Sequence, residues 1–145
     1  MDFQVHIPFV EHMGFRLEAW DGGEAVVCFD PAPEHLNSFQ VVHGGASMTL
    51  LDVAMALAAR SEQKDTGVVT IEMKTSFLRA AQGPLRAHGR LLHRSATLAF
   101  VQGEITDGQG RLCAHATGTF KFVRRLATGP RSLRPFAGDQ AIATD

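Results

Sequence analysis

The chain shows two different periodicities of hydrophobic and polar positions. From Gly44 to about Gln63, apolar residues such as Met48, Leu51 and Met55 recur at helical spacing. This segment is rich in alanine and almost free of charge, so we expect a long helix that is buried on nearly all sides. On both sides of it the pattern alternates with a period of two, as in strands. The expected strands cover residues 15–20, 24–29, 68–80, 85–97, 98–107 and 111–123.

The order of these elements indicates the fold class. A short helix over residues 8–14, with Pro near its start and Gly at its end, precedes the first two strands. One small-residue helix lies in the chain among a majority of strands, which favours an α+β fold with a curved antiparallel sheet wrapped around that long central helix. We expect one domain over residues 1–125. Residues 126–145 are rich in Gly, Pro and Ala without periodicity, and they predict a flexible tail.

Composition narrows the partners and the compartment. Fourteen Lys and Arg face fifteen Asp and Glu, so no global basic field attracts nucleic acid or an anionic membrane. The N-terminus lacks the features of a signal peptide, and no apolar run reaches about 18 residues. Together these features predict a cytoplasmic protein. Cys28 and Cys113 are interpreted as buried, reduced core residues.

No metal site is expected, because the histidines of the strands and of the loop before the long helix do not have metal-ligand spacing. These histidines are His35, His88, His93 and His115.

The start of the long helix, His43-Gly44-Gly45, is the first candidate for chemistry. A glycine pair can serve only to form a tight turn into a helix. A helix start also offers free backbone N–H groups and the positive end of the helix dipole, and glycine leaves them open to an oxyanion. Both interpretations fit the glycines alone.

Asp52 is the second candidate. It is surrounded by Leu, Val, Met and Ala, with no basic residue within one helical turn. A carboxylate in the core is usually paired or capped; a desolvated one has a raised pKa and can act as a base or nucleophile. Gly45 and Asp52 are seven residues apart, or about 10 Å along a helix axis, so one carbonyl group cannot touch both. Two copies of the helix packed antiparallel across a two-fold axis would bring them together.

The segment HLNSFQVVHGGASMTLLDVAMALAA resembles the signature of the hotdog-fold acyl-CoA thioesterases of the phenylacetate-pathway (PaaI-like) type. In it, Asn37 stands six residues before His43, and Asp52 stands nine residues after it. The similarity covers about residues 8–123. It implies the hotdog fold, a homodimer or a tetramer built from two dimers, an acyl-CoA substrate and no separate cofactor, since CoA is part of the substrate.

The resemblance also implies roles for individual residues. The N–H of Gly44, assisted by Gly45, would polarise the thioester carbonyl, and Asp52 of the partner chain would attack it or activate water. Asn37 and His43 would line the site, and Thr70 would orient the water or the acid. A hotdog dehydratase and a non-catalytic acyl-CoA-binding module are the alternatives; the first uses a different histidine motif, and the second has no use for Asp52.

Substrate contacts are predicted more coarsely. CoA carries phosphates, and among the basic residues near strand ends we selected Arg94 and Lys121 as their candidate partners. The acyl group would contact Phe39, Met48 and the short N-terminal helix.

Overall fold

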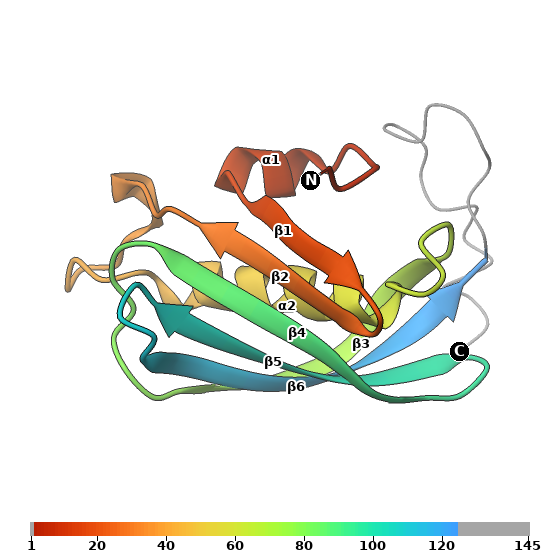
Figure 1. Cartoon of the computed structure of the whole chain (residues 1–145). Coiled ribbons are helices and arrows are strands. Elements are labelled where there is room, and N and C mark those ends of the chain that lie inside the picture. The colour runs from red at the N-terminus through yellow and green to blue at the C-terminus, as the bar shows by residue number, and fades with distance from the viewer. Residues whose placement is uncertain (1, 125–145) are drawn as a thin grey trace.

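The computed structural model describes residues 2–124, and the predicted tail at 126–145 lies outside them. Six strands and one long helix make up most of the described chain (Figure 1). The elements are α1 (Pro8–Met13), β1 (Arg16–Asp21), β2 (Glu24–Phe29), the 3-10 helix η1 (Pro33–His35), α2 (Gly44–Ala59), β3 (Gly67–Phe77), β4 (Leu85–Arg94), β5 (Leu98–Asp107) and β6 (Leu112–Val123).

The strands form a single antiparallel sheet in the order β1-β2-β4-β5-β6-β3. The sheet curves around α2, which lies along its inner side (Figure 1). This confirms the predicted α+β fold. Strand β3 follows α2 in the chain but pairs only with β6, so its other edge has no strand beside it among the described residues. Within residues 2–124, no helix is both long and apolar enough to cross a membrane.

The turn after α2 explains why the helix is shorter than predicted. The helix ends at Ala59 instead of near Gln63. The Arg60 side chain donates hydrogen bonds to the backbone carbonyls of Lys64 and Thr66, and the Ser61 hydroxyl donates to a carbonyl of the last helical turn. These bonds stabilise a compact turn in place of a further turn of helix.

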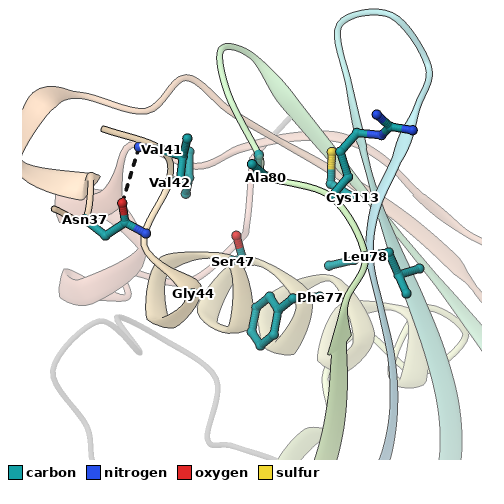
Figure 2. Close-up of a pocket in the computed structure, with 12 residues that line it drawn as sticks. Asn37, Val41, Val42, Gly44, Ser47, Phe77, Leu78, Ala80 and Cys113 are labelled. Carbon is teal, nitrogen blue, oxygen red and sulfur yellow. Dashed lines mark hydrogen bonds between the residues drawn. The ribbon is translucent and has the colours of Figure 1, made fainter. Parts of the chain in front are cut away.

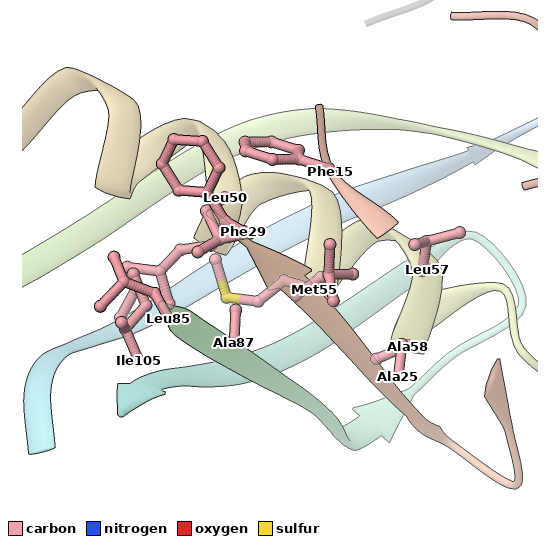
Figure 3. Packing of buried hydrophobic residues seen from close by; sticks show 14 of the residues in the cluster. Phe15, Ala25, Phe29, Leu50, Met55, Leu57, Ala58, Leu85, Ala87 and Ile105 are labelled. Carbon is pink, nitrogen blue, oxygen red and sulfur yellow. The ribbon is translucent and has the colours of Figure 1, made fainter. Parts of the chain in front are cut away.

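One face of α2 forms the centre of the core. Leu50, Leu51 and Met55 are fully buried. Figure 3 shows Leu50 and Met55 among the core side chains between the helix and the sheet. The helix approaches β4 so closely that a Cβ atom on Gly89 would lie 2.3 Å from the carbonyl oxygen of Ala54. A glycine is therefore required at position 89 for the helix to lie against the sheet.

The other face of α2 is not buried, so the expectation of a helix buried on nearly all sides was wrong. Its residues follow the spacing of one helical stripe and are exposed or half-buried, because the sheet ends at β3 and leaves this side of α2 uncovered. They are Gly45, Met48, Thr49, Asp52, Val53 and Ala56. We call this set the open stripe.

The cysteines differ from each other. Cys113 is buried, as predicted. Cys28 is only half-buried, and its thiol lies beside the Glu18 carboxylate. The prediction of a core position was wrong for Cys28 because its side chain lies on the side of β2 opposite the fully buried Val27 and Phe29.

Candidate active site

The start of α2 leaves one backbone donor free. His43 is the N-cap, and its Nδ1 accepts a hydrogen bond of 2.8 Å from the N–H of Gly45. A Cβ on Gly45 would lie 3.0 Å from this nitrogen, so glycine allows the ring to lie close. The N–H of Gly44 has no hydrogen-bond partner in residues 2–124. Of the two predicted donors, Gly44 is therefore the available one.

A cavity of about 390 Å³ lies next to this free donor. Its walls come from the start of α2, the loop before it and the chain that leaves β3, as Figure 2 shows. Most of the lining is apolar. The lining residues are Asn37, Val41, Val42, Gly44, Ser47, Phe77, Leu78, Arg79, Ala80, Ala81, Cys113 and Ala114.

Asn37 is held in a fixed orientation by its own loop. Its Oδ1 accepts hydrogen bonds from the N–H groups of Phe39 (2.9 Å) and Val41 (3.4 Å). The amide oxygen is thus occupied, and the Nδ2 donors point toward the start of α2 (Figure 2). Asn37 and Gly44 therefore present N–H donors at one end of the cavity.

Asp52 lies on the open stripe of α2, two turns away from Gly44. Its Oδ1 accepts a hydrogen bond of 2.6 Å from the Thr70 hydroxyl. Burial raises the pKa of Asp52 above its usual value, and the hydrogen bond from Thr70 partly opposes that rise. Among the described residues, Asp52 is thus paired with Thr70 and with no cation. A half-buried carboxylate of this kind is suited to accept a proton.

The six predicted site residues fall into two groups within the chain. Asn37, His43, Gly44 and Gly45 lie at the start of α2; Asp52 and Thr70 lie further along the helix. Asp52 is eight positions after Gly44, which corresponds to about 12 Å along the axis of α2. Asp52 does not line the cavity. One chain therefore holds two half-sites.

The residues predicted to contact the substrate do not line this cavity. Arg94 places its guanidinium 4.0 Å from the ring centre of Phe122, and Lys121 is paired with Val69, next to Thr70. Phe39 is 84% exposed at the loop, and Met48 lies on the open stripe, so neither lines the cavity. Helix α1 contributes nothing to its wall either. Among the described residues there is also no cluster of three or more His, Cys, Asp or Glu that could hold a metal ion.

Most residues of the cavity wall were not singled out from the sequence, and two of them, Ser47 and Phe77, bear directly on the start of α2. Ser47 is one helical turn after Gly44, which was a usable signal, because residues three apart share a helix face. Phe77 ends β3, and a Cβ on Gly44 would lie 3.3 Å from its ring. Nothing in the local sequence predicts that second contact, since it depends on how β3 lies against α2.

Comparison with known proteins identifies the family. A sequence model of the Thioesterase superfamily matches residues 39–114, which include most of the site. The chain belongs to this superfamily. Among solved structures, the conserved protein PA5202 of Pseudomonas aeruginosa is 33% identical, with a TM-score of 0.77 over 81% of this chain and 94% of that one. This similarity, together with that of two relatives described below, confirms the hotdog fold and the PaaI-like resemblance.

The name of one of these relatives gives the operon that it comes from, and the name of the other gives an enzyme activity. The Escherichia coli PaaI protein from the phenylacetic acid degradation operon is 25% identical, with a TM-score of 0.75 over 83% of this chain and 86% of its own. The E. coli protein YigI, a medium/long-chain acyl-CoA thioesterase, is 26% identical over 81% of this chain and 87% of its own.

Proposed function

We propose that the protein is an acyl-CoA thioesterase that hydrolyses an acyl-CoA to the free acid and CoA. The observation that carries this proposal is the pair of half-sites: a free N–H at the start of α2, beside an apolar cavity, and a half-buried carboxylate with a raised pKa. The activity of YigI and membership of the Thioesterase superfamily support it.

In the proposed reaction, the thioester carbonyl oxygen accepts hydrogen bonds from the Gly44 N–H and Asn37 Nδ2. These donors and the helix dipole stabilise the negative charge that develops on the oxygen as the carbonyl carbon becomes tetrahedral. Asp52 either takes a proton from the attacking water or attacks the carbonyl carbon itself. The C–S bond then breaks and CoA leaves as the thiolate. In the second case an Asp52–acyl anhydride forms, and water then hydrolyses it to the free acid and restores the carboxylate. His43 positions the helix start, and Thr70 orients Asp52.

A complete site requires two chains, because Gly44 and Asp52 of one chain are too far apart. The geometry of β3 supports a two-fold dimer. Phe77 lies against Gly44 and Thr70 binds Asp52, so the two half-sites lie near opposite ends of this open-edged strand. Antiparallel pairing of two β3 strands about an axis near Lys74 would place Phe77 of one chain opposite the Thr70 region of the other. Gly44 would then face Asp52 of the second chain.

A subunit-mixing experiment tests the composite site. Gly44→Pro removes the N–H at the first helical position, where proline is tolerated. Gly44→Ala is the matched control, because its Cβ also contacts the Phe77 ring while its backbone N–H is kept. We expect Gly44→Pro and Asp52→Asn to be nearly inactive alone. After reversible dissociation and random mixing, half of the dimers would be mixed, each with one intact site, so activity would return to about a quarter of the wild-type value.

The outcome separates the alternatives. If subunit exchange is demonstrated by mass and both variants fold, a mixture that stays inactive refutes the shared site. A wild-type protein that binds acyl-CoA without releasing CoA would instead be the non-catalytic binding module. Hydration of an enoyl-CoA without thioester cleavage would indicate the dehydratase. The resemblance leaves a dimer and a tetramer of two dimers as alternatives, which light scattering distinguishes. Arg94 and Lys121 are the proposed partners of the CoA phosphates.

A further inference from the structure

The cavity contains a buried polar group that the proposed reaction does not use. Ser47 is only 3% exposed, and its side chain lines the cavity. Figure 2 shows the hydroxyl pointing away from the helix toward Val42 and Ala80. Among residues 2–124 it has no hydrogen-bond partner. The hydroxyl therefore faces the open space of the cavity, where it is available to a bound molecule.

The other polar groups of the lining are accounted for. Asn37 has its amide oxygen bonded within its loop, and the Cys113 thiol donates to the carbonyl of Arg111. Arg79 is exposed to solvent. Ser47 is therefore the buried polar side chain of the cavity that is left for a ligand.

The apolar walls indicate which part of an acyl-CoA lies here. The pantetheine arm carries two amides, and apolar walls such as Val42, Phe77 and Ala81 would leave them without partners. An acyl chain has no such requirement. With the thioester carbonyl at the Gly44 N–H, the acyl group therefore extends into the cavity past Ser47.

Helix geometry sets the position of the oxygen that Ser47 would bind. Ser47 is about 4.5 Å beyond Gly44 along the axis and on the same face. The carbonyl oxygen lies about 3 Å before the Gly44 nitrogen, and the serine hydrogen bond spans a further ~2.8 Å toward the ligand. Because the hydroxyl points away from the helix, this bond runs across the axis, and the two oxygens lie about 7 Å apart along it, as in an acyl chain with an oxygen on its fifth or sixth carbon.

We propose that Ser47 is a specificity-determining residue whose hydroxyl binds an oxygen on the acyl group four or five carbons beyond the thioester carbonyl. The inference rests on the proposed thioesterase activity, of which it names the substrate class. The enzyme thus favours 5-hydroxyacyl or 5-oxoacyl groups over unsubstituted chains of equal length.

The experiment compares hexanoyl-CoA with each enantiomer of 5-hydroxyhexanoyl-CoA. We expect the wild-type kcat/KM to be about fivefold to tenfold higher for one hydroxylated substrate. Ser47→Ala, which favours helix and fits the space, should reduce that ratio to about one with little change for hexanoyl-CoA. Ser47→Thr should retain it. Ser76→Ala removes a hydroxyl from β3 outside the cavity and should leave the ratio unchanged.

A binding measurement separates this inference from the proposed function. Dissociation constants of the same compounds are measured by calorimetry on Asp52→Asn with and without Ser47→Ala. Hydrolysis without preference, or an equal loss for both substrates in Ser47→Ala, overturns the role of Ser47 and leaves the thioesterase intact. Preferential binding that Ser47→Ala abolishes, without any hydrolysis by the wild type, supports Ser47 and overturns the thioesterase. Absence of both binding and hydrolysis overturns both.

Discussion

Replacing Thr70 by Val tests how the Asp52 carboxylate is tuned. The substitution keeps the size and the β-branched shape of the side chain but removes the hydroxyl that donates to Asp52. That hydrogen bond lowers the pKa of Asp52, and burial raises it. Without the hydroxyl only the effect of burial remains, so the pKa of Asp52 rises further. The carboxylate that the reaction needs then forms at higher pH.

The size of the effect depends on pH. A hydrogen bond to a charged group contributes about 1.5–3 kcal/mol, and the exposure of Thr70 in the chain favours the lower end of that range. Since about 1.4 kcal/mol is a factor of ten, the ionised fraction on the acid side falls about tenfold. Well above the pKa, Asp52 is ionised in both proteins, and only the smaller loss from poorer orientation of Asp52 remains.

The assay measures kcat/KM from pH 4 to 8 by the loss of thioester absorbance, which needs no thiol reagent. For the free enzyme this profile reports the ionisation of Asp52. Thr70→Ser should restore the wild-type acid limb. Thr119→Val, which removes a hydroxyl that donates to the exposed Glu72, is the control and should not move it. An equal loss at every pH, or a shift of the limb to lower pH, would refute the proposed tuning.

Three further substitutions have defined outcomes. Asp52→Asn should lower kcat by at least about a hundredfold. Burial raises the pKa of Asp52, so the charge that forms as pH rises destabilises the folded state. In denaturant unfolding at pH 7, Asp52→Asn should therefore be more stable than the wild type by about 0.5–2 kcal/mol, and this difference should shrink in acid. His43→Leu should cost about 0.5–2 kcal/mol by removing the N-cap of α2, and His43→Asn should recover it; equal stabilities would exclude the cap. Gly89→Ala should destabilise by about 1–3 kcal/mol or more through its clash with Ala54, and an unchanged melting temperature would contradict that close approach.

The fold was predictable because its main determinants are local. Two periodicities distinguish α2 from the strands, and Gly22 and Gly23 both adopt the positive φ that a tight hairpin turn requires. The end of α2 was not predictable, because the Arg60 side chain bonds carbonyls in a turn whose shape the sequence does not show. The exposure of the open stripe likewise depends on where the sheet ends.

The site was predictable as a set of residues but not as a geometry. The sequence treats Gly44 and Gly45 as equivalent donors, and only the position of the His43 ring shows that Gly45 is occupied. The lining of the cavity was not predictable for a similar reason. Its outer wall comes from residues 77–81, more than thirty positions after Gly44, so Phe39 was a reasonable expectation from the sequence alone.

The stability of α2 comes mainly from the face opposite to Asp52. The glycine pair costs the helix up to about 1 kcal/mol per residue, and the half-buried charge of Asp52 adds to that cost. On the other face Leu50, Leu51 and Met55 are 0% exposed, and burial of each contributes about 1.5–3 kcal/mol. The core side chains therefore outweigh the unfavourable residues of the site. A substitution confined to Asp52 leaves that core intact, so a loss of turnover in Asp52→Asn reports chemistry and not unfolding. Ser47 lies on the buried face, and the comparison of two substrates on the same Ser47→Ala protein cancels any effect on its stability.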